Sequence, residues 1–74
     1  MTNQVRARVT VSVNGAPHEL TTPATLDALV ATLTAAPSGV AAAVNETVVP
    51  RGQWASTVLA DGDRVEVLTA VQGG

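Results

Sequence analysis

The last two residues of the sequence, Gly73 and Gly74, are the ones whose type and position best suit chemistry. Glycine has no side chain and accepts backbone conformations closed to other residues, so a Gly-Gly tail can thread a narrow enzyme channel. A free α-carboxylate at Gly74 is ionised at neutral pH and becomes a useful electrophile only after conversion to an acyl-adenylate or a similar ester. We therefore predict a flexible tail, residues 72–74 (Gln72, Gly73 and Gly74), with Gly74 as the point of modification. A frayed chain end explains the same two glycines equally well from the sequence alone.

Other reactive side chains are few and isolated. The chain has no cysteine, which excludes a thiolate zinc site, a redox pair and a cysteine nucleophile. Its one histidine, His18, has no ligand or nucleophile partner near it in the sequence and is interpreted as a surface side chain. The serines Ser12, Ser38 and Ser56 lack the context of a nucleophile elbow. The sequence thus predicts no catalytic residue, no metal site and no bound cofactor, and we expect a protein that is not itself an enzyme.

Length and charge narrow the possible partners. With 74 residues, 46% of them hydrophobic, the chain is predicted to form a single domain, residues 1–74. A net charge of −2 and the absence of lysine leave no basic patch for nucleic acid or anionic lipid. No apolar signal segment opens the sequence, and the longest apolar run, Val40–Val44, is too short to span a membrane. We expect a cytoplasmic protein that binds neither nucleic acid nor membrane.

Alternating residues predict a hairpin at the start of the chain. From Val5 to Val13 the odd positions are apolar and the even positions are polar, which indicates a strand with one buried face. Asn14-Gly15 suits a two-residue type I′ turn, so Ala16–Thr21 is expected to return as the antiparallel partner. Pro17 cannot donate a ladder hydrogen bond and therefore indicates an edge strand.

One helix is predicted to follow, over Leu26–Leu33. Its apolar residues recur at helical spacing, Thr25 is a suitable N-cap, and Pro37 and Gly39 are expected to end it. Strands are then predicted, in chain order, at Val40–Val44 (buried), Thr47–Val49 and Asp63–Val71, with a 3₁₀ turn within Gln53–Ala60 anchored by Trp54, Val58 and Leu59.

This order of elements predicts an α+β protein of the β-grasp class. The economical arrangement is a mixed sheet of four to five strands, with the first and last strands parallel at its centre and one main helix on one face. A ferredoxin-like fold would need a second substantial helix, which Gln53–Ala60 is too short to supply. The predicted core combines the strand alternation with the helix stripe: Val9, Val11, Leu26, Leu29, Val30, Leu33, Val65 and Val67.

The last strand carries a second functional signal. Its outer face changes from the charged residues Arg64 and Glu66 to the apolar Leu68 and Ala70 just before the tail. An exposed apolar patch can mark a partner surface, so Leu68 and Ala70 are predicted to dock a partner. Partial cover by a neighbouring element is the alternative interpretation.

Three segments of the sequence carry motifs: Val44–Trp54 with its Val-Pro-Arg-x-x-Trp run, Leu59–Val67 with Asp-Gly-Asp, and the ending Val71–Gly74. Together they resemble the ThiS family, the bacterial sulfur-carrier proteins of thiamine biosynthesis, which share the ubiquitin-like β-grasp fold. The resemblance spans nearly the whole chain. The sequence departs from it by a few extra residues before the first strand and by an alanine-rich third strand.

The resemblance implies a carrier whose Gly74 carboxylate is adenylated, with ATP and magnesium, by a ThiF-type adenylating enzyme. A persulfide, formed ultimately by a cysteine desulfurase, then supplies sulfur to give a thiocarboxylate, which a ThiG-type thiazole synthase uses to build the thiazole ring. Two alternatives share the same fold and tail. One is a sulfur carrier for molybdopterin or another sulfur-requiring pathway, and the other is a ubiquitin-like protein modifier.

Overall fold

The structure of the chain is a computed structural model that describes residues 8–34 and 39–69. The predicted start of the first strand at Val5, Pro37 as a helix stop, Ala70 and the tail 72–74 lie outside the described residues. The elements in chain order are β1 (Arg8–Val13), β2 (Ala16–Thr21), α1 (Leu26–Leu33), β3 (Val40–Val44), β4 (Thr47–Val49), the 3₁₀ helix η1 (Arg51–Ser56) and β5 (Arg64–Thr69).

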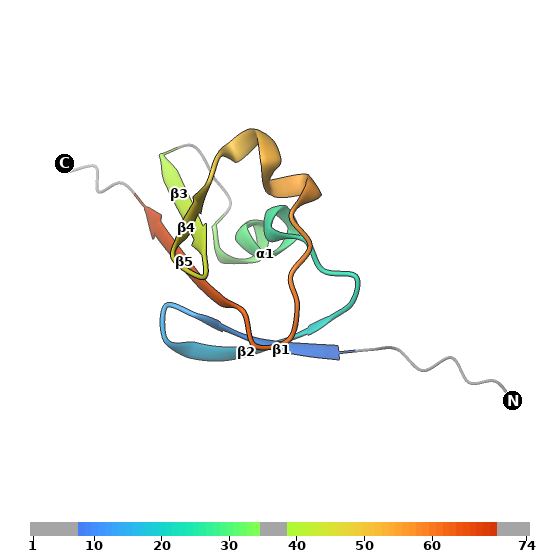
Figure 1. Cartoon of the computed structure of the whole chain (residues 1–74). Helices are drawn as coiled ribbons and strands as arrows, with labels where there is room; N and C mark the ends of the chain where they lie inside the picture. Colours follow the sequence, from blue (N-terminus) through green and yellow to red (C-terminus); the bar gives the residue numbers. More distant parts are fainter. Residues whose placement is uncertain (1–7, 35–38, 70–74) are drawn as a thin grey trace, which may run out of the picture.

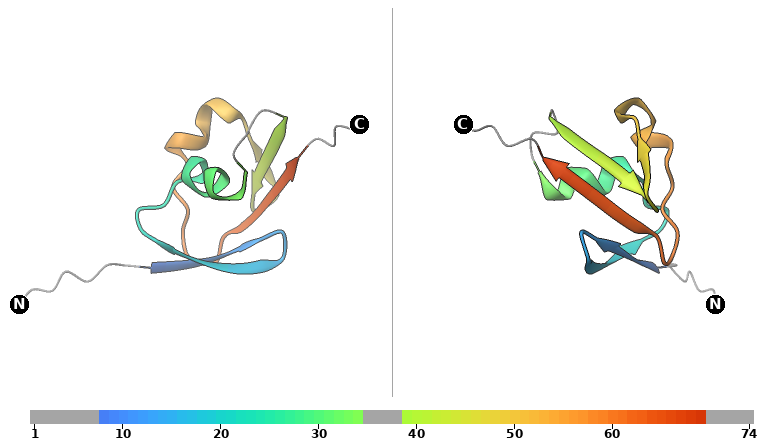
Figure 2. Two further views of the ribbon diagram at one scale, coloured as in Figure 1. Left: turned by 180° about the vertical axis from the view of Figure 1, so that it is seen from behind. Right: turned by 60° about the vertical axis from the view of Figure 1, so that its left-hand side comes forward.

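The strands form one mixed sheet in the order β2-β1-β5-β3-β4, which curves around α1 (Figure 1). β1 and β5 are parallel neighbours at the centre, and the other neighbouring pairs are antiparallel. Figure 2 shows β5 and β3 side by side. Most of β5 extends beyond its short pairing with β1. The predicted mixed sheet of four to five strands, with a parallel central pair and one main helix, is confirmed, and the sheet has five strands.

Local turn chemistry determines the first hairpin as expected. Asn14 and Gly15 both have positive φ, 51° and 87°, which is the conformation that a type I′ turn requires. The turn pairs Val13 with Ala16, and β2 is an edge strand of the sheet, so the missing N–H of Pro17 leaves no gap inside the sheet.

α1 begins where its cap predicts but buries less of its stripe than expected. The backbone N–H of Ala28 donates to Thr25 Oγ1 at 3.3 Å, which confirms Thr25 as the N-cap. The helix ends at Leu33, and its C-cap Thr34 is already extended, well before Gly39. Leu33 is 41% exposed, so its assignment to the core was wrong. It lies in the last turn of an eight-residue helix, roughly 10 Å along the axis from Leu26, where the stripe is no longer covered.

The core lies between α1, η1 and the inner face of the sheet. Its buried residues are Val11, Val13, Leu26, Leu29, Val30, Ala42, Trp54, Leu59, Val65 and Val67, with Val9 only partly buried at its edge. The prediction that Val40–Val44 is a buried strand holds for Ala42 alone, because only one face of β3 is covered.

The segment after β4 is anchored by Trp54 and Leu59, as predicted, but not by Val58. The Trp54 indole N–H donates to the Val49 carbonyl at 2.9 Å, and the Arg51 guanidinium lies 5.6 Å from the ring centroid. Val58 is 63% exposed, because it lies in extended backbone bridged to Thr25, where neighbouring side chains point to opposite sides.

Within residues 8–34 and 39–69, no helix has the length and apolar character needed to cross a bilayer.

Candidate functional site

The outer face of β5 is open, whereas its inner face is part of the core. Val65 and Val67 point inward and are 1% and 7% exposed. Leu68, the next residue along the strand, is 67% exposed, and Glu66 is exposed as well. Leu68 therefore lies on the surface where the sequence predicted a docking residue, and its predicted companion Ala70 is outside the described residues.

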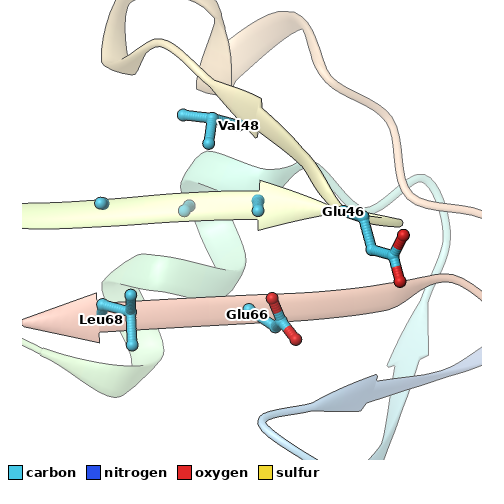
Figure 3. Close-up of a pocket in the computed structure, with 7 residues that line it drawn as sticks. Glu46, Val48, Glu66 and Leu68 are labelled. Atoms are coloured by element: carbon cyan, nitrogen blue, oxygen red, sulfur yellow. The ribbon is translucent and has the colours of Figure 1, made fainter.

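Leu68 forms one side of a shallow hollow of about 270 Å³ on this face, here called the outer-face groove (Figure 3). Figure 3 shows Leu68 and Glu66 on β5, Val48 on β4 and Glu46 at the turn between β3 and β4. The groove is lined by Ala41, Ala42, Ala43, Glu46, Val48, Glu66 and Leu68.

Strand register explains the shape of the outer-face groove. Ala41 lies opposite Leu68, and Ala43 lies between Glu66 on one neighbouring strand and Val48 on the other. The small side chains of Ala41 and Ala43 thus form a low central row, with larger side chains rising from β4 and β5 on either side. An apolar side chain of a partner can enter between them and bury apolar surface.

Val48 is the residue of this site that the sequence prediction missed. It is 71% exposed and points outward, as Leu68 does on the other side of the alanines. The signal was present in Asn45-Glu46, whose φ values of 51° and 73° form a two-residue turn. A turn of that length pairs Val44 with Thr47 and Ala43 with Val48, which places Val48 beside the alanines and Val49 toward the core.

The charged residues of the outer-face groove give it a negative border. Glu46 is paired with Arg64 at 3.4 Å on the exposed surface. Glu66 forms no ion pair with any residue in the described part of the chain. An apolar group flanked by a cationic one therefore matches the groove in both polarity and charge.

Other polar side chains act within the fold. Asp61 accepts a hydrogen bond from the Thr10 backbone at 2.7 Å, and Asp63 accepts from the Ala60 backbone at 2.8 Å, so both carboxylates stabilise the turn before β5. His18 lies half-buried on the edge strand β2. Across residues 8–34 and 39–69, no three histidine or acidic side chains gather as a metal site would require.

Comparison with known proteins identifies the family. The model of the ThiS family matches residues 11–74, which covers the sheet from the middle of β1 onward and extends to the final glycine. The chain belongs to the ThiS family.

Individual relatives agree with this assignment. The chain is 40% identical to the sulfur carrier protein ThiS of Escherichia coli strain K12 over 37 residues, half of this chain and 56% of that protein. It is 38% identical to a thiazole synthase of Magnetococcus marinus over 64 residues, 86% of this chain but 20% of that protein. The chain therefore spans only part of the length of these relatives.

A solved structure supports the fold independently. The crystal structure of the thiamine biosynthesis protein ThiS from Geobacter metallireducens superposes with a TM-score of 0.69 at 30% identity, covering 89% of this chain and all of that one. The β-grasp class predicted from the order of elements is confirmed.

Proposed function

We propose that this chain is a sulfur carrier of thiamine biosynthesis whose working group is the carboxylate of Gly74. The observation that carries the proposal is the extent of the family match. It runs from within β1, through β5 with its exposed outer face, to the final Gly-Gly. The name of the Escherichia coli relative, a sulfur carrier protein, supports the same role. In this proposal the chain is the substrate of partner enzymes and contributes a surface and a tail, not a catalytic centre.

The proposed chemistry begins with activation of the carboxylate. A carboxylate oxygen of Gly74 attacks the α-phosphorus of ATP on a ThiF-type adenylating enzyme, pyrophosphate leaves, and magnesium balances the phosphate charge. The terminal sulfur of a persulfide, supplied through a cysteine desulfurase, then attacks the carbonyl carbon and displaces AMP. A thiol cleaves the remaining S–S bond and leaves the thiocarboxylate. Since this chain has no cysteine, the sulfur must arrive on a partner.

The proposed docking surface for the activating enzyme is the outer-face groove. Leu68 and Val48 flank the alanines of β3, and Leu68 lies only six residues before Gly74 in the sequence. A partner bound there holds the domain while the tail, including Gln72 and Gly73, reaches the ATP site. Ala70 remains a predicted member of this surface.

The proposed acceptor of the sulfur is a ThiG-type thiazole synthase. The thiazole synthase of Magnetococcus marinus contains a segment similar to 86% of this chain, which supports a link between the two activities. The acceptor is tested by supplying the thiocarboxylated chain to a thiazole synthase and, separately, to a molybdopterin-forming enzyme. Sulfur transfer to the second alone would reassign the pathway while leaving the carrier role intact.

The decisive experiment is an intact-mass measurement. The purified chain is incubated with the activating enzyme, ATP, magnesium and hydrosulfide, which displaces AMP directly. We expect one oxygen to be replaced by sulfur, and fragmentation to place the change at Gly74. The untreated mass establishes whether Gly74 carries a free carboxylate. An unchanged mass with an enzyme that adenylates another ThiS protein would overturn the carrier role.

Deletion of Gly74 tests the position of the carboxylate. The shortened chain keeps a terminal glycine, but its carboxylate is displaced by one residue, about 3.3–3.6 Å of extended chain. A misplacement of ~1 Å can cost about a hundredfold in rate, so adenylation is expected to fall at least that far. Its unfolding curve is expected to match that of the full chain, because the described core ends before the tail. Normal sulfur transfer by the shortened chain would contradict the proposal.

A further inference from the structure

Two asparagines hold β5 from opposite sides in closely similar ways. Asn14 begins the β1–β2 turn and Asn45 begins the β3–β4 turn, each with φ of 51°. The backbone N–H of Asn14 donates to the Val65 carbonyl at 2.9 Å, and that of Asn45 donates to the Arg64 carbonyl at 2.7 Å. Each side-chain amide adds two further hydrogen bonds, but the two amides act at opposite ends of the strand.

The side chain of Asn14 extends the sheet beyond the end of β1. The last residue pair between β1 and β5 is Val13 with Val65, so Val67 has no strand neighbour on that side. There the Asn14 Nδ2 donates to the Val67 carbonyl at 3.1 Å, and the Val67 N–H donates to Asn14 Oδ1 at 2.9 Å. A side-chain amide carries one donor and one acceptor group in the same sense as a peptide, and it replaces the missing strand here.

The side chain of Asn45 makes two hydrogen bonds at the start of β5, one with the backbone and one with a side chain. Its Oδ1 accepts from the Arg64 N–H at 2.9 Å, and its Nδ2 donates to Asp63 Oδ1 at 3.0 Å. These contacts lie four to five residues before Leu68, whereas the Asn14 contacts are on the residue that immediately precedes it.

We propose that Asn14 is a positioning residue for partner docking, acting through Val67 on the direction of Leu68. β3 supports this part of β5 on one side, with Ala42 opposite Val67 and Ala41 opposite Leu68. The Asn14 amide supplies the support on the other side. With both sides held, Leu68 projects over the outer-face groove in one orientation, and the activating enzyme does not have to order the strand when it binds. This role rests on the proposed function.

The test compares Asn14→Gly with Asn45→Gly. Glycine keeps the positive φ of both turns, and each variant loses one side-chain amide and two hydrogen bonds. Each also gains the same backbone freedom in the unfolded chain, so the pair is matched in kind. Both are assayed at a temperature where denaturation curves show them fully folded.

Two measurements separate positioning from a general loss of stability. Amide hydrogen exchange is expected to quicken by about tenfold or more at Leu68 in Asn14→Gly but not in Asn45→Gly. In steady-state adenylation, the KM of the activating enzyme for Asn14→Gly is expected to rise roughly fivefold, with kcat within about twofold of the parent. Asn45→Gly is expected to keep both constants within about twofold.

The possible results are distinct. An equal rise of KM in both variants, no rise in either, or unchanged exchange at Leu68 in Asn14→Gly would overturn the role of Asn14 and leave the carrier function standing. Failure of the parent chain itself to be adenylated would overturn the proposed function, and the positioning role with it.

Discussion

The two faces of β5 belong to the same six residues yet serve different purposes. The inner face places Val65 and Val67 against α1 and the rest of the core, while the outer face presents Glu66 and Leu68 to solvent. On the inner side the helix and η1 cover the sheet, and on the outer side no described element does (Figure 3).

This difference shows how so small a domain separates stability from recognition. A domain of this size has a free energy of unfolding of about 4–11 kcal/mol, so few substitutions on the inner face can be tolerated. The outer face is free of that constraint because its side chains bury little within the chain. Their type and order, a row of alanines between Val48 and Leu68, fit the partner docking proposed above.

The largest expected effect comes from the same substitution made on the two sides. Leu29→Ala removes a buried side chain of α1 and is expected to lower the free energy of unfolding by about 2–5 kcal/mol. Leu68→Ala removes the same atoms from an open surface and is expected to change it by less than about 0.5 kcal/mol. Chemical denaturation of both measures the contrast. Equal losses would show that the outer face is part of the core after all.

A charge on the outer face is expected to reverse the contrast when binding is measured. Leu68→Asp places a carboxylate at one side of the proposed interface, next to Glu66, and should weaken the complex with the activating enzyme by roughly 2 kcal/mol, about thirtyfold. Val58→Asp is the matched control, because Val58 is similarly exposed but lies outside the groove. Titration calorimetry provides the affinities. If both variants bind like the parent, Leu68 has no part in docking.

Neighbouring alanines of β3 provide a third comparison. Ala42 is buried in the core, so Ala42→Leu overfills a packed space and is expected to cost about 1–3 kcal/mol of unfolding free energy. Ala41→Leu points outward and should leave stability within about 0.5 kcal/mol, but it fills the groove and should weaken partner binding. Unchanged binding by Ala41→Leu would mean that the groove stays empty in the complex.

The elements with strong local signals were predictable from the sequence. Asn14-Gly15 requires positive φ at both residues and thereby fixes the register of the first hairpin. Thr25 and the apolar spacing after it locate the helix, and the order of elements leaves few topologies for a parallel central pair.

The errors arose where an apolar residue continued a sequence pattern but no neighbouring element covers it in the fold. Leu33 continues the helical stripe, but α1 ends there and the residue is exposed. Val58 was grouped with Leu59 as a helical anchor, whereas extended backbone sends the two to opposite sides. The outer-face groove was only half predicted, because Leu68 is visible on its own strand while Val48 depends on pairing between strands. The contacts of Asn14 with Val67 join residues 53 positions apart and have no local signal.

The smallest expected effect concerns the charge of the outer face. Glu66 is exposed and forms no ion pair within the described residues, so Glu66→Gln should leave the unfolding free energy within about 0.5 kcal/mol. If a cationic group of the activating enzyme approaches this edge of the groove, the charge accelerates association more than it strengthens the final complex. The association rate of Glu66→Gln is then expected to fall by about two- to threefold at low ionic strength. The difference should disappear near 1 M salt, where the screening length is only about 3 Å.

Glu19→Gln separates this local effect from the net charge of the chain. It makes the same chemical change on β2, the edge strand at the far side of the sheet, where Glu19 pairs with Arg8 at 3.3 Å. Both variants reduce the net charge from −2 to −1, so a general attraction to a cationic enzyme would slow them equally. Stopped-flow association rates across a salt series make the comparison. A loss confined to Glu66→Gln places the cationic group of the partner at the groove, and equal losses would leave the groove with apolar recognition alone.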